Sequence, residues 1–188
     1  DGLTMYKTKP QVVVLPETRE EVCYVLRTCK DLVVPVVARG AGTGLSGGAL
    51  PHAEGVLLVM TKFNRILGVD ADARTARVEP GVRNLAISEA VSHPNLYYAP
   101  DPSSQIACSI GGNIAENSGG VHCLKYGLTV HNVLSLTVAL DDGSIITVGS
   151  DALDSAGYDL LALTIGSEGL LAVVLEITVR LLAKPEEM

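Results

Sequence analysis

Residues 39–48 carry the densest set of groups that could bind an anion. The stretch reads Arg-Gly-Ala-Gly-Thr-Gly-Leu-Ser-Gly-Gly and lies between the apolar runs 33–38 and 56–60. Its five glycines leave backbone N–H groups unobstructed by Cβ atoms, and the hydroxyls of Thr43 and Ser46 add further donors. The stretch therefore predicts a concave site for a phosphate or diphosphate. Glycine-rich connections also occur as plain turns, and this alternative stays open.

Residues 42–47 match the G-x-G-x-x-G pattern of nicotinamide dinucleotide sites, but their surroundings do not. That pattern must open a helix, whereas Gly48, Pro51 and Gly55 crowd the residues that follow. No acidic residue closes the next apolar run to bind a ribose, and the Gly-Lys-Ser/Thr of a Walker A loop is missing as well. We therefore predict a phosphate site without a helix behind it.

A second glycine motif occupies residues 108–120. Ser109 is a good helix N-cap, and Gly111 and Gly112 in the first turn would leave helical N–H groups open to a ligand. Asn117 predicts the end of this helix after about two turns. Close packing of the helix against a neighbour is the other explanation for two early glycines, which weaken a helix by about 1 kcal/mol each.

A third motif, Gly-Ser-Glu-Gly, spans residues 166–169, and its Glu168 could either contact a ligand hydroxyl or cap the turn. Eleven of the 19 glycines lie in the three motifs. Strand pairing does not explain such a concentration, so we expect each of the three motifs to be under a further constraint.

The elements that must position these motifs are of different types in the first and the later part of the chain. A capping box at residues 18–21 predicts a helix over 18–31, between strands 11–15 and 33–38, which gives a β-α-β unit with a parallel pair. The later part predicts two hairpins and one long strand, over 66–79, 133–148 and 171–182, and short helices over 84–91, 109–117 and 158–163. We expect an α+β fold with a small parallel β-α-β lobe, 1–61, and a larger mixed or antiparallel lobe with flanking helices, 62–188.

Composition limits the classes of partner and compartment. A formal charge of −7 argues against nucleic acid as the main partner, because a phosphate backbone needs a basic face. The chain is apolar, at 47% hydrophobic residues, yet no apolar run approaches the roughly 20 residues of a transmembrane helix. No secretory signal is visible, and four cysteines without metal-site spacing indicate reduced thiols in the cytoplasm. One phenylalanine and no tryptophan suggest a fragment of a longer protein.

The spacing of the three glycine motifs resembles the FAD-binding domain of the vanillyl-alcohol oxidase and p-cresol methylhydroxylase (PCMH-type) superfamily. Within it, residues 35–48 and 97–112 are similar to the FAD subunits of bacterial glycolate oxidases. The resemblance extends from about residue 1 to residue 185. Some relatives attach the flavin covalently through a histidine in the first loop. Position 43 is threonine here, so the resemblance implies noncovalent FAD.

The resemblance also implies which residues meet the cofactor. Loop 39–48 would enclose the pyrophosphate, segment 80–82 would lie near the adenosine, and segments 100–104 and 108–120 would follow the ribityl chain and the ring. The expected cofactor-binding residues are Arg39, Gly40, Ala41, Gly42, Thr43, Gly44, Ser46, Gly47, Gly48, Pro80, Gly81, Val82, Pro100, Asp101, Ser103, Ser104, Cys108, Ser109, Gly111, Gly112, Ala115, Asn117, Gly120 and Val173.

In such enzymes the flavin accepts hydride from the α-carbon of a 2-hydroxy acid while a base takes the hydroxyl proton. The substrate-binding arginine, the metal-binding histidines and that base belong to a cap domain and C-terminal segment of the family. Both would lie beyond Met188, so we expect no catalytic residue and no metal ligand in this chain. His122 and His131 are candidate bases, and a structural role is favoured for His122, which lies just past the second motif.

The resemblance implies oxidation of glycolate to glyoxylate by the full-length protein. It further implies an iron–sulfur subunit and a second flavin-type subunit as partners, in a cytoplasmic complex peripheral to the inner membrane. Two alternatives stay open. One is oxidation of D-lactate or another 2-hydroxy acid, and the other is a noncatalytic module that binds a nucleotide diphosphate.

Overall fold

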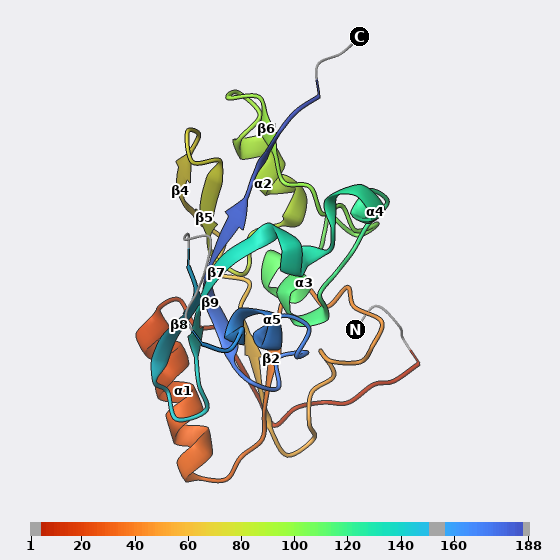
Figure 1. Cartoon of the computed structure of the whole chain (residues 1–188). Helices are drawn as coiled ribbons and strands as arrows, with labels where there is room; N and C mark the ends of the chain where they lie inside the picture. Colours follow the sequence, from red (N-terminus) through yellow and green to blue (C-terminus); the bar gives the residue numbers. More distant parts are fainter. Residues whose placement is uncertain (1–4, 151–156, 186–188) are drawn as a thin grey trace.

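The computed structural model describes residues 5–150 and 157–185 (Figure 1). The first part of the chain forms a three-stranded parallel sheet from β1 (Val12–Val14), β2 (Val36–Arg39) and β3 (Val56–Val59), with helix α1 (Arg19–Asp31) between β1 and β2. The strand order is β1-β3-β2, so the expected direct pairing of the first two strands is wrong. The strand β3 takes the central place because its Leu57 and Leu58 are the most deeply buried residues of the sheet.

The second sheet has five antiparallel strands in the order β4-β5-β9-β7-β8. Its strands are β4 (Ile66–Asp70), β5 (Thr75–Val78), β7 (Val133–Ala139), β8 (Ile145–Gly149) and β9 (Val173–Arg180). The helices beside it are α2 (Asn84–Ala90), α3 (Ile110–Glu116), α4 (Cys123–Tyr126), the 3₁₀ helix η1 (Thr129–Asn132) and α5 (Leu160–Thr164). The expected α+β class, with a small parallel sheet and a larger antiparallel one, is confirmed.

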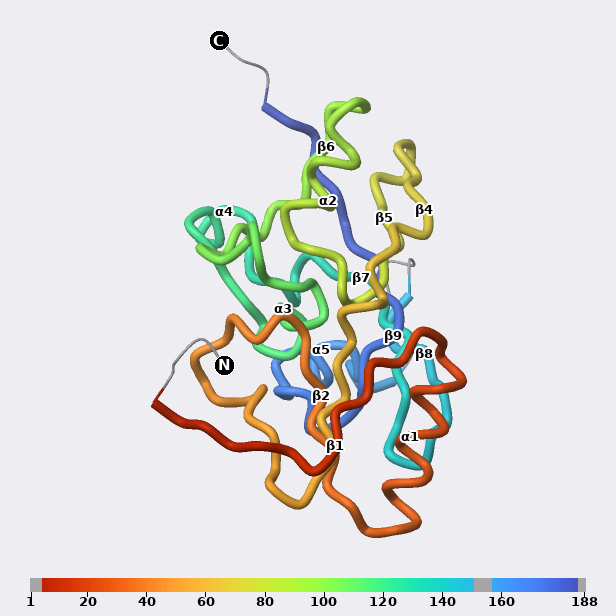
Figure 2. Tube along the Cα trace, turned by 180° about the vertical axis from the view of Figure 1, so that it is seen from behind, coloured from red at the N-terminus to blue at the C-terminus, as the bar shows by residue number. Residues whose placement is uncertain are grey.

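The helix α1 begins where its capping residues predicted. The Thr18 hydroxyl accepts the Glu21 N–H at 3.2 Å, and the Glu21 carboxylate accepts the N–H of Glu17. Both views show α1 beside β8 (Figures 1 and 2), and Arg27 Nε donates to the Asp142 carbonyl in the turn of that hairpin. The helix therefore connects the small sheet to the edge of the large one.

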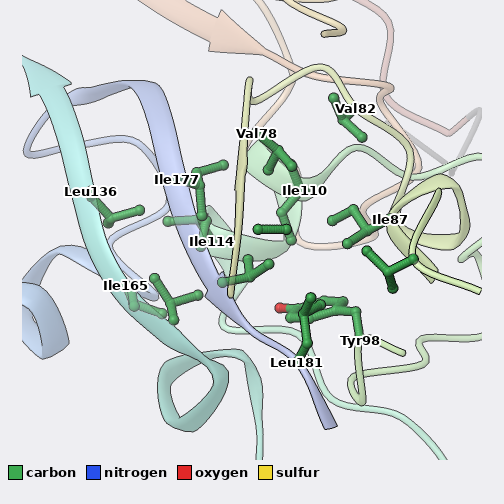
Figure 3. Packing of buried hydrophobic residues seen from close by; sticks show 14 of the residues in the cluster. Val78, Val82, Ile87, Tyr98, Ile110, Ile114, Leu136, Ile165, Ile177 and Leu181 are labelled. Carbon is green, nitrogen blue, oxygen red and sulfur yellow. The ribbon is translucent and has the colours of Figure 1, made fainter. Parts of the chain in front are cut away.

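One face of β9 supplies both hydrophobic cores. Its first half contributes Leu175 to a core shared with α1 and β3, where Leu26 and Leu58 are buried. Its second half contributes Ile177, which packs with Ile110 and Ile114 of α3 in the larger core (Figure 3). A single strand thus connects the packing of the two sheets. The division into lobes 1–61 and 62–188 stays a prediction.

A two-stranded ribbon was not predicted. The strand β6 (Leu96–Tyr97) pairs antiparallel with β10 (Leu182–Ala183), at two residues each. Strands this short give no periodic pattern in the sequence. Within the two described stretches, no helix combines the length and apolar character needed to cross a membrane.

Two buried thiols on α1 predict a loss of stability in alkaline solution. Burial raises the pKa of Cys23 and of Cys29 above the ordinary value of 9.0. The unfolded chain then ionises first, so this contribution is complete below about pH 9 and is lost as the pH rises through the folded-state values. Urea unfolding at increasing pH should show the free energy of unfolding falling above about pH 9. Cys29→Ala should reduce the fall, and an unchanged slope in that variant would contradict the assignment.

Candidate functional site

The three glycine motifs meet around one cleft. A cavity of about 160 Å³ is lined by the first loop, by α3 with the residue before it, and by residues 168–174 at the start of β9. The members of the predicted site that line it are Arg39, Gly40, Ala41, Gly42, Thr43, Gly44, Gly48, Pro80, Ser104, Cys108, Ser109, Gly111, Gly112, Ala115 and Val173. The constraint expected on each motif is explained by its position, because residues of all three motifs line the same cavity.

The remaining members of the predicted set do not line this cavity. They are Ser46, Gly47, Gly81, Val82, Pro100, Asp101, Ser103, Asn117 and Gly120. Ten lining residues were not predicted: Ala38, Ala49, Met60, Asn113, Glu116, Ser118, Glu168, Gly169, Ala172 and Val174. Most of these residues lie inside or next to the same motifs, so a prediction that included every residue of each motif and its neighbours would have found them.

The first loop presents free backbone donors. Across the described residues, the N–H groups of residues 41–48 donate no hydrogen bond, although Leu50 N–H beyond them bonds to the Gly47 carbonyl. Gly42 and Gly47 have φ values of 72° and 87°, which a residue with a Cβ adopts only with strain. No helix follows the loop, as predicted, and β3 begins at Val56. The arrangement is suited to an anion held by backbone donors.

The start of α3 is different, because its N–H groups are already used. Ser109 Oγ accepts the Gly112 N–H, as expected of an N-cap, while the N–H groups of Ile110 and Gly111 donate to the carbonyls of Val82 and Pro80 at 2.8 Å. The expectation that Gly111 and Gly112 leave open donors is therefore wrong. A Cβ on Gly111 would lie 2.7 Å from the Pro80 Cβ, so close packing explains that glycine.

The first loop also packs against the same helix terminus. A Cβ on Gly40 would lie 2.2 Å from Ser109 Oγ. A side chain at position 40 would therefore displace the Ser109 hydroxyl, whereas the Ser109 Cβ and the Gly112 N would lie at ordinary contact distances.

The third motif closes the other end of α3. The N–H groups of Gly166 and Glu168 donate to the carbonyls of Ile114 and Ala115, at 2.8 and 2.9 Å. Asn117 ends the helix with a left-handed φ of 49°, as predicted, and its Oδ1 accepts the Val130 N–H. The motif thus fixes α3 against the start of β9, and the backbone N–H of Glu168 does part of this capping.

The charges in the cleft are few and mixed. Arg39 is the one cationic side chain among the described lining residues, and its Nη1 donates to the Ala49 carbonyl at 3.4 Å. Glu116 and Glu168 bring two carboxylates close to Gly48, and the Ser46 hydroxyl bonds to Glu116 at 2.6 and 2.7 Å. An anionic ligand would therefore depend on the backbone donors of the first loop more than on side-chain charge.

A buried amide pair positions the segment before α3. Asn113 Nδ2 donates to Asn84 Oδ1 at 2.8 Å, and Asn84 Nδ2 donates to the Pro100 carbonyl at 2.9 Å. The Asn84 N–H bonds to the Cys108 carbonyl, so both ends of segment 100–108 are held by α2. No periodic pattern or motif predicts this pair, because its members lie 29 positions apart.

The turn that carries Pro80 rests on a buried carboxylate. Glu79 accepts from Arg65 at three positions, from Nε and Nη2 at 3.1 and 2.7 Å and from the backbone N–H at 2.8 Å. The Glu79 side chain is 5% exposed, whereas that of Arg65 is 72% exposed. The backbone donor therefore depends on Glu79 more than the guanidinium does, since water can solvate the latter.

Glu79→Ala should lower the free energy of unfolding by about 1–3 kcal/mol, because it removes charged hydrogen bonds and leaves the Arg65 N–H without an acceptor. Urea denaturation would measure the change. Glu89→Ala, at an exposed position on α2, is the matched control and should stay close to wild type. Equal stability of the two variants would contradict this account of the turn.

The family follows from a comparison with known proteins. Residues 10–149 match the family model described as an FAD binding domain. The chain belongs to this family. The recognition of a PCMH-type FAD domain from the spacing of its glycine motifs is thereby confirmed.

Individual relatives of this FAD-binding domain agree. The glycolate oxidase subunit GlcD of Escherichia coli K12 is 66% identical over 185 residues, covering 98% of this chain and 37% of that protein. GlcD of Bacillus subtilis is 45% identical over 187 residues, covering 99% and 40%. The D-lactate dehydrogenase of Archaeoglobus fulgidus is 44% identical over 178 residues, covering 94% and 40%. The chain thus spans about two fifths of the length of these relatives.

A solved structure shares the fold of this domain. Alkyldihydroxyacetonephosphate synthase superposes with a TM-score of 0.81 at 25% identity, covering 93% of this chain and 32% of that one. The match supports the arrangement of the two sheets around the cleft.

Proposed function

We propose that this domain binds FAD noncovalently in the cleft between the first loop and α3. The observation that carries the proposal is the set of free N–H groups on the loop residues that line the cleft, 41–44 and 48. Such a set can accept the diphosphate of a dinucleotide without a helix dipole or a lysine. Arg39 would add one positive charge at the start of the loop. Thr43 stands where some relatives carry the histidine that attaches the flavin, which supports noncovalent binding.

The predicted contacts divide into two classes under this proposal. Loop residues would bind the cofactor through their backbone, and Ser104, Cys108 and Val173 would contact it from the facing walls. Gly81 and Val82 follow Pro80 in the sequence and do not line the cavity. They would help to hold α3 in place, because the Val82 carbonyl accepts the Ile110 N–H. Bound FAD would supply the hydride acceptor, which none of the amino-acid side chains can provide.

The full-length protein would be a 2-hydroxy-acid dehydrogenase that oxidises glycolate to glyoxylate. Identity of 66% to a glycolate oxidase subunit, against 44% to a D-lactate dehydrogenase, favours glycolate. Substrate binding and proton removal would come from the part of the relatives that this chain does not cover, so the domain alone would not turn over. D-lactate is the second candidate substrate, because a dehydrogenase for it is also a close relative.

The proposal includes an assembly. The relatives' name, glycolate oxidase subunit, supports partners in a complex, and an iron–sulfur subunit and a second flavin-type subunit would carry electrons onward. We place this complex in the cytoplasm, at the surface of the inner membrane. The noncatalytic alternative, a nucleotide-binding module, would bind a nucleotide diphosphate without any redox change.

The substrate is tested with the full-length protein, glycolate, D-lactate and an artificial electron acceptor. We expect a higher kcat/KM for glycolate. Equal or faster turnover of D-lactate would overturn the choice of substrate while leaving the FAD site intact. Binding of FAD without reduction by any 2-hydroxy acid would favour the noncatalytic module.

A further inference from the structure

Asp101 and His122 form a closely held pair near the cleft. His122 Nδ1 lies 2.6 Å from Asp101 Oδ2, and the His122 backbone N–H donates to Asp101 Oδ1 at 3.2 Å. A carboxylate accepts hydrogen bonds, so we assign Nδ1 as the donor in this pair. Both carboxylate oxygens of Asp101 thus bond to His122, one to its side chain and the other to its backbone N–H.

The chain brings these residues together at a glycine. A Cβ on Gly120 would lie 2.4 Å from the carbonyl carbon and oxygen of Asp101. These are backbone atoms that cannot rotate away, so any side chain at position 120 would separate the two segments. Gly120 does not line the cavity, and its contact with Asp101 gives the reason for a glycine there.

The pair joins two segments that both line the cleft. Asp101 begins the segment that contributes Ser104 and Cys108, and His122 ends the segment that contributes Ser118. The ring of Tyr126 lies beside the imidazole, with the two ring centroids 6.5 Å apart. The Asn84 bonds to Pro100 and Cys108 hold the first segment to α2, but they do not connect it to the chain beyond α3.

Global stability is a poor explanation for this pair. The Asp101 side chain is 19% exposed and that of His122 is 63% exposed. Pairs with an exposed member add little to the free energy of unfolding. What the pair does provide is a direct link between the segment that contributes Ser104 and Cys108 to the cleft and the segment that contributes Ser118.

We propose that Asp101 and His122 are positioning residues that clasp segments 100–104 and 118–122 together around bound FAD. The inference rests on the proposed function. Asp101 would act on the cofactor through the segment it holds, without touching it, which differs from the direct contact expected from the sequence. His122 would act through Nδ1–H, and its Nε2 would be dispensable.

The test uses the full-length protein loaded with FAD and follows cofactor release by flavin fluorescence. His122→Ala removes the donor and should raise the FAD dissociation rate by up to about fivefold, the upper range for a pair with an exposed member. His122→Asn keeps an N–H donor near the position of Nδ1 but has no counterpart of Nε2, and it should restore a rate close to wild type. His93→Ala, at an exposed position outside the cleft, is the matched control and should leave the rate unchanged.

The outcomes distinguish a failure of the Asp101–His122 proposal from a failure of the proposed FAD binding. An unchanged rate in His122→Ala would overturn the clasp and leave FAD binding intact. A rate in His122→Asn as fast as in His122→Ala would overturn it too, because Nε2 would then be the group that matters. A wild-type protein that binds no FAD at all would refute the proposed function and the clasp together.

Discussion

Ile177→Ala should lower the free energy of unfolding by about 2–5 kcal/mol, the range for removing a large aliphatic side chain from a packed core. Ile177 is fully buried in the middle of β9, where it contacts the cluster formed with α3 (Figure 3). Because β9 pairs with both β5 and β7, a cavity there affects the sheet on two sides. Urea denaturation of the apoprotein, monitored by circular dichroism, would measure the loss.

The matched control for this variant is Ile146→Ala. Ile146 lies on the edge strand β8 and is 38% exposed, so its truncation leaves no enclosed cavity. A loss in Ile146→Ala as large as that in Ile177→Ala would show that the core is not organised around β9.

Gly40→Ala should weaken FAD binding about ten- to a hundredfold, corresponding to the roughly 1–3 kcal/mol that overpacking costs. The new Cβ would lie 2.2 Å from Ser109 Oγ, so the hydroxyl must turn away from the Gly112 N–H that it caps. Loss of this N-cap bond weakens the start of α3, which is one wall of the cleft. Fluorescence titration of the apoprotein with FAD would give the dissociation constants.

Gly68→Ala serves as the control, because a Cβ at that position meets nothing within 4 Å and the residue does not have a positive φ. It should bind FAD like wild type. If Gly40→Ala also did so, the contact between β2 and α3 would not determine the geometry of the cofactor site.

Much of the local structure could be predicted because its causes are local. Thr18 and Glu21 determine where α1 begins, Asn117 determines where α3 ends, and the hairpin of β7 and β8 follows from its turn. The absence of a helix after the first loop followed from Pro51 and the flanking glycines. Each of these depends on residues within a few positions of one another.

The features that were predicted wrongly, or not predicted, depend on contacts between residues far apart in the chain. The place of β3 between β1 and β2 is a choice of partner, which strand composition does not specify. The prediction that the Gly111 N–H is free is wrong because nothing in the sequence shows that Pro80 packs against this residue. The Asn84–Asn113 bond and the Asp101–His122 pair join residues 29 and 21 positions apart, and both are decided by the tertiary fold.

The central claim is that the free backbone donors of residues 41–44 and 48 receive the diphosphate of FAD. The most direct measurement is a titration of the purified apoprotein with FAD, followed by visible absorbance and by release of the flavin on denaturation. The account predicts a yellow protein with one flavin per chain, released intact as FAD. A colourless protein that gains no flavin spectrum at saturating FAD, or flavin that stays attached after denaturation, would contradict it.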